Sequence, residues 1–211
     1  NEMVGRIKKD DESVPYFENE YYYYSRYEEK KEYPIYCRKH KNLGNKEEII
    51  LDVNDLAEGY DYFAIGGISI SPDNQWLAYG ADTLSRRFYK IYFKHLESGE
   101  ILDQTISNTT GGVAWANDNK TIFYTLKNKV TLLGEKIYRH QLGTDSNQDE
   151  MVYEEKDESF YNGVYRSKSG EYIIIYNSST LVSDYHILSA DNPSGNFQNF
   201  TPRGTKHEYG T

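Results

Sequence analysis

The stretch "ISISPDNQWLAYGAD" at residues 68–82 returns in altered form as "VAWANDNKTIFYTLK" at residues 113–127. A third and looser copy, "VYRSKSGEYIIIYNS", begins at Val164. Each copy places a short segment rich in Asp, Asn, Ser or Gly between two apolar segments, which is the pattern of a β-hairpin. We therefore predict a fold built from repeats, with turns at residues 71–74, 116–119 and 167–170.

Two more strands follow each predicted hairpin. The third strand of each set contains a tyrosine, and Tyr92, Tyr138 and Tyr185 stand 46 and 47 residues apart. The fourth strand is short, as in "ILDQTI", "EMVYEE" and "FQNFT". Upstream, "VPYF", "YYYYSRY", "PIYCRK" and "EEIILD" form another set of four. This spacing is typical of β-propeller blades, which repeat about every 40–50 residues.

These sets predict an all-β protein that forms an incomplete β-propeller, with four consecutive four-stranded antiparallel sheets as its blades. Strands such as "TIFYT" and "YIIIY" are apolar on both faces, which favours blades packed between neighbours over a β-sandwich, the main alternative. The segment "VNDLAEGYDY" predicts a short capped helical turn. The predicted boundaries are a lead-in at 1–13, blades at 14–55, 56–110, 111–158 and 159–203, and the start of another blade at 204–211.

The composition limits the possible partners and compartment. The chain has 24 Lys and Arg against 33 Asp and Glu, a net charge of −9, which argues against nucleic acid and anionic membranes as partners. Cys37 is the single cysteine, so no internal disulfide can form, which fits a reducing compartment. No apolar run approaches the roughly 18 residues of a membrane span. We expect a cytoplasmic protein, with the periplasm left open.

The sequence carries no recognisable catalytic, cofactor-binding or metal-binding constellation. The Gly-x-Ser-x-Gly elbow of serine hydrolases is missing, and no two histidines stand four residues apart. The histidines on the third strands stand 45 and 46 residues apart, at places that we predict to be equivalent. They could converge near a ring axis, but separate positions with their own polar partners are favoured. The five histidines are His40, His95, His140, His186 and His207.

Four other segments have a functional and a structural interpretation. "DVNDLAEG" at 52–59 superficially resembles a calcium-binding loop, but it lacks the Gly at the sixth position and the Glu at the twelfth, so we do not expect it to bind calcium. "YYYYSRY" at 21–27 could stack on sugars or bases, but alternation along a strand favours a core strand. Arg86 and Arg87 could pair with Asp82 within a hairpin or serve an interdomain contact. The acidic segment 145–159 is predicted to be a solvated loop and edge, whose functional role would be to attract basic peptides through Asp149, Glu150, Glu154 and Glu155.

Several long segments together resemble one family. "YFENEYYYYSRYEEKKEYPIYCRK", "SPDNQWLAYGADTLSRRFYKIYFKHLESGEIL", "VAWANDNKTIFYT" and "KIYRHQLGT" are similar to the N-terminal part of oligopeptidase B (protease II), a branch of the prolyl oligopeptidase family of serine peptidases. The resemblance implies a seven-bladed propeller that covers an α/β-hydrolase domain with a Ser-Asp-His triad. It also implies that the propeller restricts entry to short peptides, and that the branch cleaves after Lys or Arg.

The resemblance implies that this chain holds about four of the seven blades and no hydrolase domain. The chain alone should therefore be inactive, with no catalytic residue, no cofactor and no metal. Its expected partners are the α/β-hydrolase domain, short basic peptides bound by the longer enzyme, and a second copy that covers exposed blade faces. The alternative is a propeller that binds a protein partner and has no enzymatic role, because a fold alone does not define a function.

Overall fold

The computed structural model describes residue 2 and residues 11–204 of the chain, and it is almost entirely β-structure. Within these residues the strands form three antiparallel sheets of four, seven and four strands. The chain divides into two compact units, residues 1–62 and residues 63–211. The predicted lead-in at 1–13 and the predicted start of another blade at 204–211 lie mostly outside the described residues.

The first unit contains the first sheet and the predicted helical turn. Its strands are paired in chain order: β1 (Tyr16–Glu18), β2 (Tyr21–Arg26), β3 (Ile35–His40) and β4 (Glu47–Asp52). Helix α2 (Val53–Ala57) follows, and the Asp52 carboxylate caps it by accepting from the backbone N–H of Asn54 at 2.9 Å. Tyr23 and Tyr24 are buried. The core-strand interpretation of the tyrosine run is therefore confirmed.

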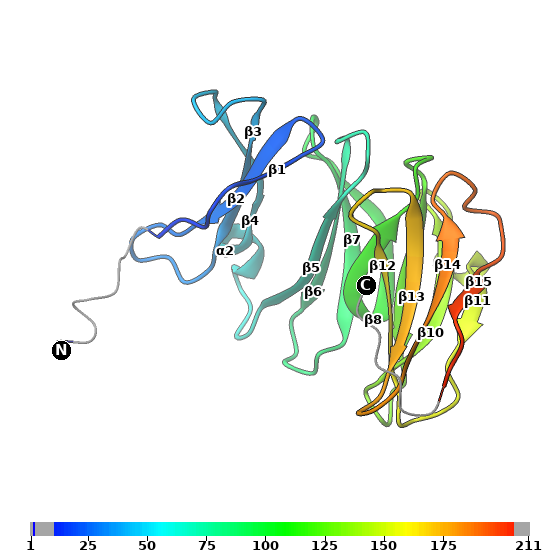
Figure 1. Ribbon diagram of the computed structural model, residues 1–211. Helices are drawn as coiled ribbons and strands as arrows, with labels where there is room; N and C mark the ends of the chain where they lie inside the picture. Colours follow the sequence, from blue (N-terminus) through cyan, green and yellow to red (C-terminus); the bar gives the residue numbers. More distant parts are fainter. Residues whose placement is uncertain (1, 3–10, 205–211) are drawn as a thin grey trace. The chain divides into compact units, whose positions relative to one another are not determined.

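The second unit holds the other two sheets, which Figure 1 colours from teal to red. The seven-stranded sheet is again paired in chain order, and so is the last sheet. The seven strands are β5 (Ala64–Ile70), β6 (Trp76–Asp82), β7 (Tyr89–His95), β8 (Ile101–Trp115), β9 (Thr121–Lys127), β10 (Gly134–Gln141) and β11 (Glu150–Glu154). The last sheet consists of β12 (Tyr161–Arg166), β13 (Tyr172–Ser178), β14 (Ser183–Ser189) and β15 (Gln198–Thr201).

Strand β8 joins two of the predicted sets into one sheet. Its first half pairs with β7, and its second half pairs with β9. The register of its pairing with β9 shifts between Thr109 and Val113, where Gly111 has a φ of +96° that favours glycine, and a Cβ on Gly80 would lie 2.4 Å from the Gly111 Cα. The prediction of four separate sheets is therefore wrong, because one long strand ends one set and begins the next. The number of blades stays a prediction.

The second unit has two apolar layers. One joins the two halves of the seven-stranded sheet and includes Phe93, Trp115 and Ile122. The other lies between the seven-stranded sheet and the last sheet and includes Phe123, Ile137, Ile173 and Ile175. Strand β9 contributes Ile122 to the first layer and Phe123 to the second, because successive side chains of a strand point to opposite faces. This accounts for strands that are apolar on both faces.

The three predicted turns are present. In 71–74, 116–119 and 167–170 the N–H of the fourth residue donates to the carbonyl of the first, at 2.8, 3.3 and 2.9 Å in that order. The fourth residues have φ of 62°, 60° and 76°, a conformation that Asn and Gly tolerate well. "WLAYG", "TIFYT" and "YIIIY" all lie on strands. In the part of the chain that is described, no helix is long and apolar enough to span a membrane.

Candidate functional site

The three histidines of the third strands occupy three different positions of the repeat. His95 lies opposite Trp76, His140 opposite Ile122 and His186 opposite Ile175. These partners are the first, second and fourth residues of their strands. The prediction of equivalent places is therefore wrong. Equal spacing along the chain does not give equal register, because β10 has a bulge between Gly134 and Lys136 and the loop that leads into β14 is shorter than the loops that lead into β7 and β10.

Each of these histidines has its own polar partner. His95 Nδ1 lies 3.0 Å from Ser98 Oγ, and His186 Nε2 lies 3.2 Å from an Asp184 carboxylate oxygen. His140 is described below. Over residues 11–204 the structure shows no group of three or more His, Cys, Asp or Glu side chains placed to hold a metal ion. His207 lies outside the described residues. The interpretation of separate histidines with satisfied polar tips is supported.

A first buried polar group, the Asp149 cluster, lies beside β9, β10 and β11. It consists of Asp149, His140, Tyr124 and Gln104. His140 Nδ1 donates to Asp149 at 2.6 Å, the Tyr124 hydroxyl donates to the other carboxylate oxygen at 2.9 Å, and His140 Nε2 contacts the Gln104 amide. The Asp149 side chain is only 2% exposed. Burial, with the charge of Asp149, raises the pKa of Tyr124 above its usual value.

A second buried polar group, the Arg203 cluster, lies at the edge of the last sheet. It consists of Arg203, Glu155, Asp184 and Phe160. Arg203 Nε donates to Asp184 at 2.6 Å, its Nη2 donates to Glu155, and its guanidinium carbon lies 3.8 Å from the centre of the Phe160 ring. The carboxylate side chains are 6% and 3% exposed, whereas the arginine side chain is 37% exposed. The guanidinium is therefore held by two charges and one aromatic face.

Further hydrogen bonds hold both carboxylates of the Arg203 cluster in place. Asp184 accepts from the Asn177 amide at 2.7 Å. Glu155 accepts from the backbone N–H of Asp157 at 2.9 Å and from the Tyr153 hydroxyl at 3.3 Å. These donors orient the two carboxylates and offset part of the cost of burying their charges.

An acidic hollow of about 360 Å³ adjoins the Arg203 cluster. Its walls are the loop between β9 and β10, the adjacent strand ends and the connection from β11 to β12. The bond from Lys136 at 3.0 Å holds the pKa of the Glu135 carboxyl below its usual value. The hollow and the Arg203 cluster share Glu155 and Phe160. Its charged and aromatic lining residues are Glu135, Glu154, Glu155, Lys156, Asp157, Glu158 and Phe160.

We predicted that the acidic segment 145–159 is a solvated loop and edge. The structure shows that this holds for only part of the segment. Asp149 and Glu155 are buried in the two clusters. Glu150 is exposed but pairs with Arg139, and Glu154 lies 3.4 Å from Lys136. Composition alone could not separate these cases, because burial depends on which strands lie beside the segment.

The remaining sequence candidates have structural roles. Asp82 accepts from the backbone N–H groups of Leu84 and Arg87 at 2.8 and 2.7 Å, so it shapes the loop through the backbone rather than through the predicted arginine side chains. Cys37 is fully buried, and burial raises the pKa of its thiol to about 11. A buried thiol of this kind is a poor nucleophile.

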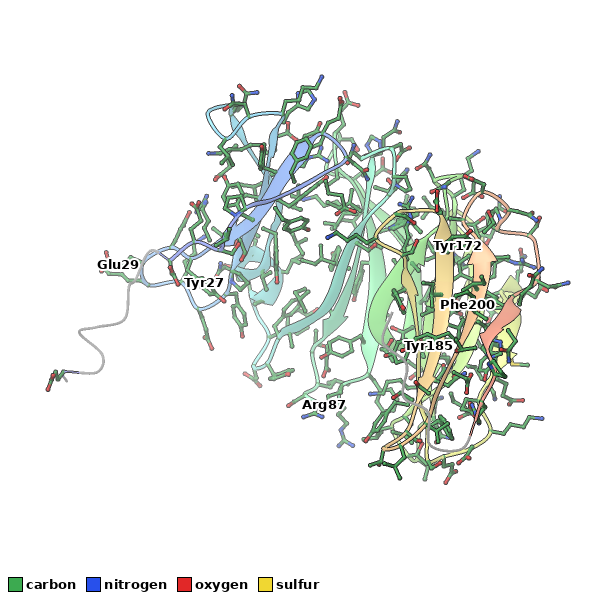
Figure 2. All side chains as sticks on the ribbon, viewed as in Figure 1. Tyr27, Glu29, Arg87, Tyr172, Tyr185 and Phe200 are labelled. Carbon is green, nitrogen blue, oxygen red and sulfur yellow. The ribbon has the colours of Figure 1, made fainter. Side chains whose placement is uncertain are left out.

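The face of the last sheet that points away from the apolar layer carries aromatic and aliphatic side chains. Ile173 and Ile175 lie in that layer, so Tyr172, Ile174 and Tyr176 point to the opposite face. Figure 2 labels Tyr172, Tyr185 and Phe200 on β13, β14 and β15. A second hollow of about 370 Å³ lies on this sheet beside Tyr172 and Ile187.

Sequence reasoning missed three members of the Arg203 cluster: Arg203, Phe160 and Asp184. One signal was available, because Asp184 begins the segment "DYHILSA", which the sequence predicts as a strand of the repeat. An acid on a strand that becomes buried needs a cation or hydrogen-bond donors beside it. Its partner could not be chosen from the sequence, because Arg203 lies 19 residues from Asp184 and 48 residues from Glu155.

Comparison with known proteins agrees with this architecture. The chain is 40% identical to dipeptidyl aminopeptidase BI of Pseudoxanthomonas mexicana, over 99% of this chain and 31% of that protein. It is 34% identical to protease 2 of Moraxella lacunata, over 90% of this chain and 29% of that protein. The chain thus spans about a third of the length of these relatives.

Solved structures of oligopeptidase B share the fold. The enzyme from Leishmania major superposes with a TM-score of 0.89 at 29% identity, over 97% of this chain and 29% of that one. The enzyme from Trypanosoma brucei, with covalently bound antipain, gives a TM-score of 0.86 at 28% identity, over the same shares of the two chains. The model of the prolyl oligopeptidase N-terminal β-propeller domain matches residues 1–211. The chain therefore belongs to the family of N-terminal β-propeller domains of prolyl oligopeptidases.

Proposed function

We propose that this chain is the gating propeller of a serine-type oligopeptidase that hydrolyses short peptides after Lys or Arg. The observation that carries the proposal is the family match over residues 1–211. The similarity to protease 2 and to two oligopeptidase B structures supports this branch of the family. In this proposal an α/β-hydrolase domain elsewhere in the longer protein supplies the triad, and the propeller limits which peptides reach it.

The acidic hollow gives the proposal some physical support. Five carboxylates and one lysine line it, so its potential favours cations. Peptides that carry Lys or Arg would be attracted to such a surface. This support concerns attraction alone, because the proposed selection at the scissile bond belongs to the hydrolase domain.

Hydrolysis of fluorogenic peptides tests the proposal. A longer protein that contains this chain and the hydrolase domain should cleave arginyl and lysyl peptides in preference to prolyl peptides. The 211-residue chain alone should show no turnover, because nucleophile, base and oxyanion donors act together. Preferential cleavage after Pro would contradict the proposed specificity, and inhibitor-sensitive turnover by the chain alone would contradict its proposed role.

We also propose that the isolated chain self-associates through the outer face of the last sheet. Tyr161, Tyr172 and Phe200 of this sheet are all exposed, and extended apolar patches on soluble proteins commonly mark interfaces. Light scattering at micromolar concentration should give the mass of a dimer, and Tyr172→Lys with Phe200→Lys should shift it to the monomer. A wild-type monomer that binds no hydrophobic dye would contradict this part of the proposal.

A further inference from the structure

The Arg203 cluster has the geometry of a binding site for a guanidinium group. Asp184 accepts from Nε and Glu155 accepts from Nη2, so two edges of the planar cation face carboxylates. The Phe160 ring covers one face of the cation, with its centre 3.8 Å from the guanidinium carbon. A guanidinium meets all three groups at once because it is planar, whereas an ammonium is a compact point charge without a flat face.

Arg203 is held to the rest of the fold mainly by the contacts of its side chain with Asp184, Glu155 and Phe160. Strand β15 ends at Thr201, and residues 202–204 have no assigned secondary structure. Pro202 has no N–H with which to continue the strand pairing. More than a third of the arginine side chain is exposed, although both of its carboxylate partners are buried. The cation can therefore leave without unfolding a strand, and the carboxylates would remain in place.

The acidic hollow provides an approach to this site from solvent. Glu155 and Phe160 line the hollow and also contact Arg203. The other acidic lining residues include Glu154, Asp157 and Glu158. A cationic side chain that enters the hollow would therefore reach the carboxylate and the ring that hold Arg203.

We propose that Glu155, Asp184 and Phe160 form a guanidinium-binding site that Arg203 occupies from within the chain. When Arg203 leaves, the site takes the guanidinium of an arginine side chain in a peptide. This is a site for the same chemical class as the substrates proposed above. It rests on contacts within the propeller and stands whether or not the longer protein cleaves peptides.

Chemical rescue of a variant without the arginine tests the proposal. The melting temperature of the Arg203→Ala chain should rise saturably, by a few degrees, with millimolar N-methylguanidinium, because a ligand that binds only the folded state stabilises it. Equal concentrations of methylammonium and of NaCl serve as controls for charge and ionic strength. The wild-type chain should not respond. An equal response to methylammonium, or an equal rise in the wild type, would overturn the proposal.

Two further variants keep the test decisive. Arg203→Lys keeps the charge and loses the planar fork, so it provides a folded background in which methylguanidinium should still raise the melting temperature if the alanine variant does not fold. Phe160→Leu added to either background should weaken the apparent affinity at least about threefold, because it removes the cation–π contact. Unchanged affinity in the leucine variant, or an Arg203→Lys chain as stable as the wild type, would contradict a site shaped for a guanidinium.

A pair of peptides separates a small cation from a peptide ligand. Blocked Gly-Arg-Gly and blocked Gly-citrulline-Gly have nearly the same shape, but citrulline is neutral. In the Arg203→Ala chain the arginine peptide should bind and raise the melting temperature, and the citrulline peptide should not. If methylguanidinium binds and the arginine peptide does not, the site accepts small guanidinium ions alone, and the peptide part of the proposal is wrong.

Discussion

The Asp149 cluster and the Arg203 cluster both bury carboxylates, but they compensate the buried charge in different ways. Each holds a buried carboxylate that also accepts from a tyrosine hydroxyl, Tyr124 in one case and Tyr153 in the other. In the Asp149 cluster the partner of the carboxylate is a histidine with a fully buried side chain. In the Arg203 cluster it is a partly exposed arginine beside an acidic hollow.

This difference separates a structural group from a candidate binding site. Asp149 and His140 are sealed between strands, and the His140 ring stacks on Phe93 at 5.9 Å. No ligand can reach them without opening the sheet. The arginine, by contrast, enters from the end of β15 and is permanently charged. Buried carboxylates alone therefore do not mark a functional site. The deciding feature is whether the side chain that pairs with them can be replaced by a cation from solution.

Removing the arginine should have the largest effect on stability. Arg203→Met leaves Glu155 and Asp184 buried without their cation, and breaking such a pair costs about 3 kcal/mol, at the low end of the usual range because the arginine is partly exposed. Urea unfolding measures the loss. Lys136→Met is the matched control, because it removes a cation from partly exposed pairs with Glu135 and Glu154 and should cost below about 1 kcal/mol. Equal losses in the two variants would remove the distinction between the Arg203 cluster and a surface pair.

Removing the histidine should cost less than removing the arginine. His140→Phe keeps an aromatic ring against Phe93 and loses the bond to Asp149, which also keeps its bond from Tyr124. A lost hydrogen bond to a charged group costs about 2 kcal/mol. His95→Phe is the control, since its Ser98 contact is exposed. Asp149→Asn added to the His140→Phe chain should restore part of the lost unfolding free energy. If it does not, the buried charge of Asp149 is not the cause of the loss.

Alkaline titration should distinguish buried tyrosines from the others. Burial, followed by the charge of Glu155, raises the pKa of Tyr153 to about 12. The unfolded chain loses this proton near pH 10, as an ordinary tyrosine does, so the contribution of Tyr153 to stability is intact below pH 10 and falls as the pH rises towards 12. Tyr153→Phe should flatten the decline in unfolding free energy over this window. An unchanged slope would place the origin of the decline at other tyrosines.

Electrostatic attraction of peptides should give the smallest effect. In the longer enzyme that we propose, Glu154→Gln with Glu158→Gln should lower kcat/KM for basic peptides about twofold at low salt and less at physiological salt, where the screening length is about 8 Å. Asp149→Asn should change stability without changing this salt dependence, because Asp149 is already paired and buried. An equal loss at both salt concentrations would contradict long-range attraction.

Local chemistry explains why the strands and turns were predictable. Asn74, Asn119 and Gly170 tolerate the positive φ that each turn requires, and the apolar segments on either side must then pair as hairpins. The short helix after β4 was also predictable, because Asp52 caps its first turn. These features depend on residues within a few positions of one another.

The sequence by itself thus determined the all-β repeats, their turns and the resemblance to a propeller family. The tertiary structure decided that β8 runs through two sets, that the histidines differ in register, and that the side chains of Asp149 and Glu155 are buried. It also decided that Arg203 reaches Glu155 across 48 residues of chain. The physical reason is range: turn and strand preferences act between near neighbours, whereas burial and ion pairing depend on which strands lie together after folding.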